Sequence, residues 1–117
     1  MANKAEVDKF ISWLEQKFTL GYRSNLVKEY GRRTANVGLY VRLNFDESGK
    51  YQSFSVTARI YAIDICGSID RLYVITQRHY ELSTEYIEKC IGAADSMEKS
   101  IVGLGDQLHR IANKVGK

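Results

Sequence analysis

Hydrophobic residues recur every three or four positions near the start of the chain, the spacing of one face of a helix. Asn3 and Glu6 form a suitable capping pair before this segment, and Gly21 is a suitable stop after it. The apolar face consists of Val7, Phe10, Ile11, Leu14 and Phe18. The pattern predicts an amphipathic helix with Trp13 at the border of its apolar stripe. The next stretch, Ser24–Tyr30, is interpreted as one or two further helical turns.

The hydrophobic period changes to two over Val37–Phe45, which is typical of a half-buried strand. Turn residues follow at Asp46–Lys50, and the alternation then resumes, so residues 37–62 are predicted to form an antiparallel hairpin. Gly67–Ser68 marks a break. After it, the β-branched and aromatic residues of Arg71–Gln77 predict a third strand.

The last third of the chain has heptad spacing after Ser83, a suitable helix N-cap. The a positions are Ile87, Ala94, Ile101, Leu108 and Val115, and the d positions are Cys90, Met97, Leu104 and Ile111. An unbroken helix over residues 84–114 is about 46 Å long, whereas a globule of this size is about 30–35 Å across. Two solutions are open: the helix breaks at Gly103 and Gly105 and folds back, or it projects and pairs with another chain.

Length and composition fit one folded domain. The chain has 117 residues, of which 44% are hydrophobic and 26% charged, far from the composition of disordered chains. No linker composition interrupts it. The predicted architecture is a single α+β domain over residues 1–117. It has an N-terminal helix, a short antiparallel sheet of about three strands, and a long C-terminal helix or helix pair packed on one sheet face.

Charge and cysteine content narrow the function classes. The net charge of +3 is too small to argue by itself for binding a long phosphate track. Two isolated cysteines do not form a disulfide framework, and we expect reduced thiols. Neither a signal peptide nor an apolar run of membrane-spanning length appears, so we expect a cytoplasmic protein without membrane contact.

No residue pattern predicts catalysis, a cofactor or a metal site. Cys66 and His79 are the one Cys/His pairing worth testing, but a cysteine in an isoleucine-rich run is more often core filler. Asp46/Glu47 and Asp64/Asp70 suit turns better than acid–base chemistry. Gly103-Leu104-Gly105 lacks the other residues of a phosphate-binding loop. We therefore expect no catalytic residues, no cofactor and no metal.

The hairpin carries the most suggestive surface. If its alternating apolar residues face the core, a set of aromatic, basic and polar residues shares the opposite face. This predicted partner-binding set is Tyr40, Arg42, Asn44, Thr57, Arg59 and Tyr61. Tyrosine and arginine are enriched at protein–protein contacts, and the same residues can hold single-stranded nucleic acid by stacking and phosphate contacts. An ordinary solvated sheet face is the third interpretation.

The leading functional hypothesis is a non-enzymatic small binding protein that regulates or inhibits a protein partner by occupying it. Such a chain also suits a phage or mobile-element accessory protein. We expect a homodimer through the C-terminal helix, because the seam extends beyond the predicted sheet. Its dimerisation residues are Ile101, Leu104, Leu108 and Ile111. The alternatives are a single-stranded nucleic-acid-binding protein that uses the hairpin face and, third, a small enzyme with dispersed site residues.

Overall fold

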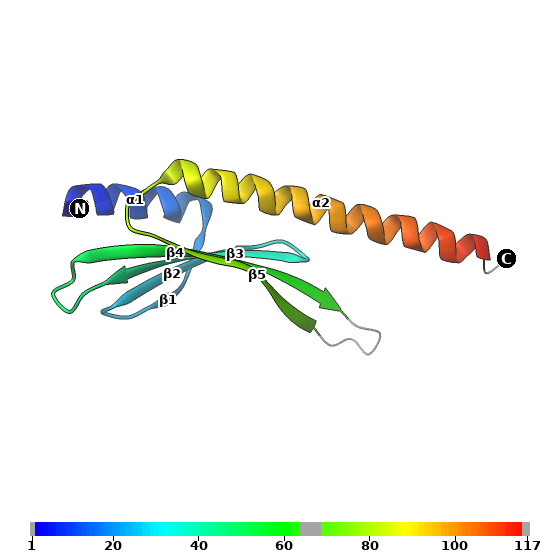
Figure 1. Ribbon diagram of the computed structural model, residues 1–117, viewed down its shortest axis with the longest axis horizontal. Coiled ribbons are helices and arrows are strands. Elements are labelled where there is room, and N and C mark those ends of the chain that lie inside the picture. The colour runs from blue at the N-terminus through cyan, green and yellow to red at the C-terminus, as the bar shows by residue number, and fades with distance from the viewer. Residues whose placement is uncertain (1, 64–68, 116–117) are drawn as a thin grey trace.

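The computed structural model describes residues 2–63 and 69–115, which form two helices and a five-stranded antiparallel sheet (Figure 1). The helices are α1 (Lys4–Lys17) and α2 (Thr84–Val115). The strands are β1 (Thr19–Arg23), β2 (Val27–Arg33), β3 (Val37–Phe45), β4 (Tyr51–Ile63) and β5 (Ile69–His79). They lie in the sheet in chain order, each antiparallel to the next. The predicted α+β architecture is confirmed, with two more strands than expected.

Helix α1 begins as predicted. The Asn3 side chain is the N-cap and accepts a hydrogen bond from the backbone N–H of Glu6, with an N–O distance of 2.9 Å. The predicted stop at Gly21 is wrong, because the helix ends at Lys17 and Phe18 is its C-cap. There the chain turns to an extended conformation and buries the Phe18 side chain, so β1 starts at once and includes Gly21.

The helical turns expected over Ser24–Tyr30 are also wrong: this stretch contains the β1–β2 turn and the first half of β2. Tyr30 lies opposite Val41 of β3 and is only 1% exposed. Its neighbours on the same face are Lys28 and Arg32. Because both are charged residues, β2 shows no alternation of hydrophobic and polar residues in the sequence. Pairing with β3 decides the conformation of a segment whose own pattern is weak.

The hairpin predicted over residues 37–62 is confirmed as β3 and β4. In its turn, Oδ1 of Asp46 accepts hydrogen bonds from the backbone N–H groups of Ser48 and Lys50, both at 2.9 Å. Gly49 takes the positive φ of 84° that this turn needs. The predicted third strand is the central part of β5, while the break expected at Gly67–Ser68 lies outside the described residues.

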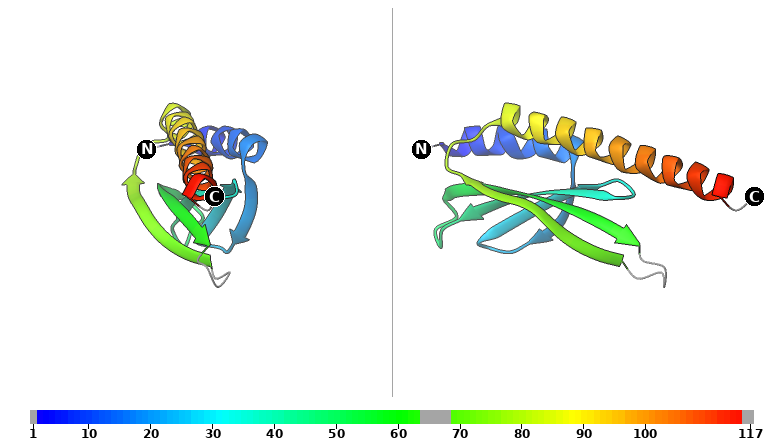
Figure 2. Two further views of the ribbon diagram at one scale, coloured as in Figure 1. Left: turned by 90° about the vertical axis from the view of Figure 1, so that its right-hand side faces the viewer. Right: turned by 45° about the vertical axis from the view of Figure 1, so that its right-hand side comes forward.

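Both helices cover the same face of the sheet, and the core lies between the two layers (Figures 1 and 2). Fully buried side chains from every layer meet there, among them Leu14 of α1, Phe54 of β4 and Ile87 of α2. Trp13 packs at the edge of this cluster, as its position on the helical wheel predicted. This face uses the apolar positions of β3 and β4, so the opposite sheet face carries their polar neighbours.

Helix α2 is continuous through Gly103 and Gly105, so the break considered at these glycines does not occur. Its first half is fixed to the sheet by a salt bridge between Asp95 and Arg32 at 3.1 Å. Glu98 then accepts hydrogen bonds from the backbone N–H and side-chain amide of Asn36, at 2.8 and 2.7 Å. Beyond this anchor the helix projects from the body (Figure 1), and the molecule is 65 Å long against 27 and 21 Å in the other directions.

Among the described residues, neither helix combines the length and the apolar character that a membrane span requires.

The Glu98 anchor predicts a pH-dependent stability. Hydrogen bonds from Thr34 and Asn36 hold the pKa of the Glu98 carboxyl below its ordinary value of 4.5. The carboxylate therefore stabilises the folded state above that value, and its contribution is lost as the pH falls through the lower folded-state pKa. We expect Glu98→Gln to lower the free energy of unfolding at pH 7 and to flatten its fall between pH 5 and pH 3, as measured by urea unfolding.

Glu85→Gln is the control, because Glu85 lies on the same helix with an exposed side chain. An acid-dependent loss of stability in Glu98→Gln as large as in the unmodified chain would contradict the role of this anchor.

Candidate binding surfaces

The predicted partner-binding residues share one sheet face, which no helix of the described chain covers (Figure 2). Arg42 is exposed, while its neighbour Val41 is completely buried on the helix side. The register pairs Tyr40 with Thr57 across β3 and β4, and it places Arg59 opposite Gly38. The structure therefore brings these residues together on the face that the strand alternation predicted. We call Tyr40, Arg42, Asn44, Thr57, Arg59 and Tyr61 the Tyr/Arg face.

Two tyrosines form the centre of this face. The Tyr40 and Tyr61 hydroxyl groups share a hydrogen bond of 2.5 Å. The rings lie over glycine backbone: a Cβ atom at Gly38 would stand 2.7 Å from Tyr40 and 2.9 Å from Tyr61. Glycine is required at this position because the Cβ atom of any other residue would collide with both aromatic rings. Burial, followed by the bond to Tyr61, raises the pKa of the Tyr40 hydroxyl, so Tyr40 keeps its proton at physiological pH.

Arginines are stacked on both rings. The Arg59 guanidinium carbon lies 4.6 Å from the centre of the Tyr40 ring, and that of Arg33 lies 3.7 Å from the centre of Tyr61. These are cation–π distances, and stacking restricts the arginine side chains to the surface of the rings. Tyr61 is only 7% exposed as a result. Its ring is therefore not available as a platform for an unpaired base.

A shallow hollow of about 300 Å³ lies beside Tyr40 and is lined by residues of β2, β3, β4 and β5. It is lined by three arginines, Arg42, Arg59 and Arg78, and by one carboxylate, that of Glu29. Glu29 holds Arg42 through bonds of 3.0 and 2.9 Å to Nε and a terminal nitrogen. The sequence did not predict Glu29 and Arg78 as members of this face. Their side chains can be placed on it only once the register of β2 with β3 and of β5 with β4 is known.

The predicted dimerisation residues lie on the projecting half of α2. Ile101 is half-buried, whereas the remaining three are more than half exposed: Leu104 (57%), Leu108 (57%) and Ile111 (58%). Met97, 39% exposed, continues the same stripe towards the body. We call Met97, Ile101, Leu104, Leu108 and Ile111 the α2 stripe.

The α2 stripe is not simply the continuation of the face that packs on the sheet. At about 100° per residue, the α2 stripe has the same angular position on the helix as Tyr86. The Tyr86 hydroxyl contacts β5 through a 2.8 Å hydrogen bond to Gln77. Asp95 leaves the opposite flank towards β2. The stripe is therefore rotated by about a quarter turn from Glu98, which faces the body.

The residues weighed for catalysis do not form a site in the described chain. Cys66 and Asp64 lie outside the described residues, and Asp46 caps its own turn. His79 lies between the rings of Phe54, on which it is stacked, and Tyr86, with ring-centre distances of 5.2 and 4.0 Å. In residues 2–63 and 69–115, no three potential metal ligands gather.

Cys90 packs against the core on the first half of α2, which is the position of a small core residue. Burial raises the pKa of its thiol above the ordinary value of 9.0. In Cys66→Ser, where Cys90 is the remaining thiol, we expect alkylation by iodoacetamide at pH 8 to be severalfold slower in the folded protein than in urea. Equal rates, followed by mass spectrometry, would contradict the assignment of Cys90 to the core.

Comparisons with protein-family models, with curated proteins and with solved structures found no match to this chain.

Proposed function

We propose that this protein is a non-enzymatic binding protein that regulates or inhibits a protein partner by occupying it, and that it acts as a homodimer joined through α2. The observation that carries the proposal is the α2 stripe. The side chains of Leu104, Leu108 and Ile111 are exposed to solvent. They lie on the part of α2 beyond Glu98, which is the last described residue that bonds the helix to the sheet layer. Leaving each side chain uncovered forgoes about 1–2 kcal/mol, so a binding partner for this segment is strongly favoured.

A second copy of the chain fits the α2 stripe. If two helices pair antiparallel about a two-fold axis near Asp106, Ile101 meets Ile111 of the partner subunit and Leu104 meets Leu108 of the partner subunit. The paired segment, residues 97–115, is about 27 Å long, which gives each apolar residue a counterpart. Two-fold dimers are also the commonest oligomers.

Gly105 of α2 leaves room for another helix beside the α2 stripe. Gly103 and Gly105 each destabilise a helix by about 1 kcal/mol relative to alanine. Nothing in the described chain explains them, since an added Cβ would meet no atom within 4 Å at either position. At about 100° per residue, Gly105 lies about 80° from the centre of the α2 stripe and borders a helix packed there, whereas Gly103 lies about 120° to the other side and faces away from it.

The Tyr/Arg face is the proposed site for the protein partner. It lies on the side of the sheet opposite α2, so dimerisation leaves it accessible (Figure 2). Its stacked arginines suit the carboxylates of an acidic protein surface. The covered tyrosine rings and the Glu29 carboxylate are less suited to single-stranded nucleic acid, which needs free rings and uniform positive charge. We further propose that the protein acts in the cytoplasm, as an accessory protein of a phage or mobile element would.

The dimer predicts a clear effect of charge on the α2 stripe. Leu104→Glu with Leu108→Glu should convert a dimer into a monomer of 13.4 kDa, because four carboxylates would then face one another in the helix pair. Sedimentation at high micromolar concentration measures the mass, and circular dichroism checks the fold. Val102→Glu is the matched control: Val102 is 49% exposed but lies off the stripe, and the dimer should persist. A monomeric unmodified protein would contradict the dimer.

The Tyr/Arg face predicts loss of binding with little loss of stability. Arg42→Ala with Arg59→Ala removes one exposed ion pair and one stacked cation, which together stabilise the fold by about 1–2 kcal/mol. Affinity for a partner purified from the native host should fall at least about tenfold by calorimetry, as for interface arginines in general. Lys99→Ala with Lys114→Ala is the control: it removes the same amount of charge from α2 and should leave the affinity for the partner unchanged.

An unchanged affinity in the arginine variant would contradict this use of the face. Tight binding of a single-stranded oligonucleotide that falls steeply with salt would instead favour the nucleic-acid alternative.

A further inference from the structure

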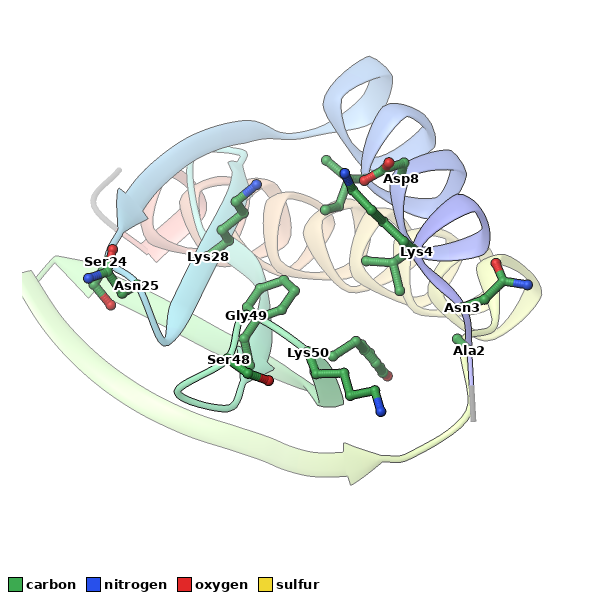
Figure 3. A pocket seen from close by; sticks show the side chains of 14 residues that line it. Ala2, Asn3, Lys4, Asp8, Ser24, Asn25, Lys28, Ser48, Gly49 and Lys50 are labelled. Carbon is green, nitrogen blue, oxygen red and sulfur yellow. The ribbon is translucent and has the colours of Figure 1, made fainter.

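A cavity of about 570 Å³ opens at the end of the molecule opposite the projecting tip of α2. Figure 3 shows that it lies between the start of α1, the β1–β2 turn at Ser24 and Asn25, and the β3–β4 turn at Ser48 and Gly49. Its volume is within the range of pockets that hold small organic molecules. Neither the Tyr/Arg face nor the α2 stripe contributes to it.

The wall of the cavity is mainly apolar. It includes Val7 and Ile11 from α1 and the aromatic rings of Phe45 and Tyr51. The Tyr51 hydroxyl is buried, and no hydrogen-bond partner for it exists among the described residues. Burial raises the pKa of Tyr51 to about 12, so the hydroxyl keeps its proton at physiological pH. A buried hydroxyl without a partner is unusual, and it belongs to a residue that lines this cavity.

The rim of the cavity is positively charged. Lys4 of α1, Lys28 of β2 and Lys50 of the β3–β4 turn all line it (Figure 3). No ion pair is recorded for these three lysines within the described part of the chain, whose ion pairs involve other residues. Asp8 is the one carboxylate among the lining residues. Asp46, which lies in the same turn as Lys50, adds a second negative charge nearby. Three ammonium groups and two carboxylates leave the rim with a positive excess, which favours a negatively charged ligand.

We infer that this cavity binds a small organic anion, a carboxylate or phosphate joined to an apolar body. The apolar body lies against Val7, Ile11 and Phe45, and the anionic group lies among the lysines. An inorganic anion would leave the apolar wall uncovered, and a neutral hydrophobic molecule would leave the positive excess of the rim uncompensated. The inference is independent of the proposed function, because it uses no residue of the α2 stripe or the Tyr/Arg face.

The test is a titration of the ¹⁵N-labelled full chain with decanoate, followed by amide NMR spectra. Binding in the cavity should shift the signals of Asn25 and Gly49 saturably, while those of Gly103 and Gly105 report on the apolar stripe of α2 and should stay unchanged. Decyltrimethylammonium has the same apolar chain with the opposite charge and should bind at least about tenfold more weakly. Decyl phosphate should bind as decanoate does.

The lysines provide the decisive variants. Lys28→Gln with Lys50→Gln should weaken decanoate binding by about five- to tenfold, the effect of two partly exposed charges. Lys99→Gln with Lys114→Gln removes two lysines from α2 and should leave decanoate binding unchanged. The NMR spectra also show whether each variant is folded. Equal binding of the anion and the cation, shifts confined to Gly103 and Gly105, or no effect of the Lys28/Lys50 pair would each overturn the inference.

Discussion

The packing of the first half of α2 on the sheet is the contact on which the rest of the structure depends. Ile87 is completely buried in the cluster that includes Phe54 and Leu14, so this half closes the core together with α1. The contact ends at Glu98, at the β2–β3 turn, whereas the helix continues to Val115. A helix of 32 residues is about 48 Å long, more than the sheet face can cover. An exposed apolar segment is the direct result.

The same layering produces the second surface. Because both helices lie on one side of the sheet, the polar positions of β3 and β4 remain on an uncovered face. Gly38 then allows the rings of Tyr40 and Tyr61 to lie on the strand, and the rings in turn hold the arginines. A dimer through α2 and a partner on the Tyr/Arg face can thus be present together, since the two surfaces are on opposite sides of the sheet.

Strong periodicity made much of this arrangement predictable. The alternation of Val37–Phe45 placed Tyr40 and Arg42 on one face, and the heptads of the last third placed Leu104 and Leu108 on one stripe. Periodicity failed for β2, where the residues beside Tyr30 on the core face are a lysine and an arginine.

Contacts that depend on three-dimensional pairing could not be predicted. Glu98 meets Asn36 across 62 positions of sequence, and the hairpin alternation alone does not reveal that Glu29 holds Arg42. The cavity at the other end of the molecule is likewise formed by three segments whose proximity follows only from the fold. The two glycines of α2 suggested a break, although the helix passes through both.

The central claim is that a second copy of the chain covers the α2 stripe. The most direct measurement is an isotope-filtered NOE experiment on a mixture of two differently labelled batches of the protein. Ile101 and Ile111 are about 15 Å apart along one helix, too far for a methyl–methyl NOE within a chain. Antiparallel pairing predicts an intermolecular NOE between Ile101 and Ile111, together with one between Leu104 and Leu108. Absence of every intermolecular NOE from these methyl groups at high micromolar concentration would contradict the claim.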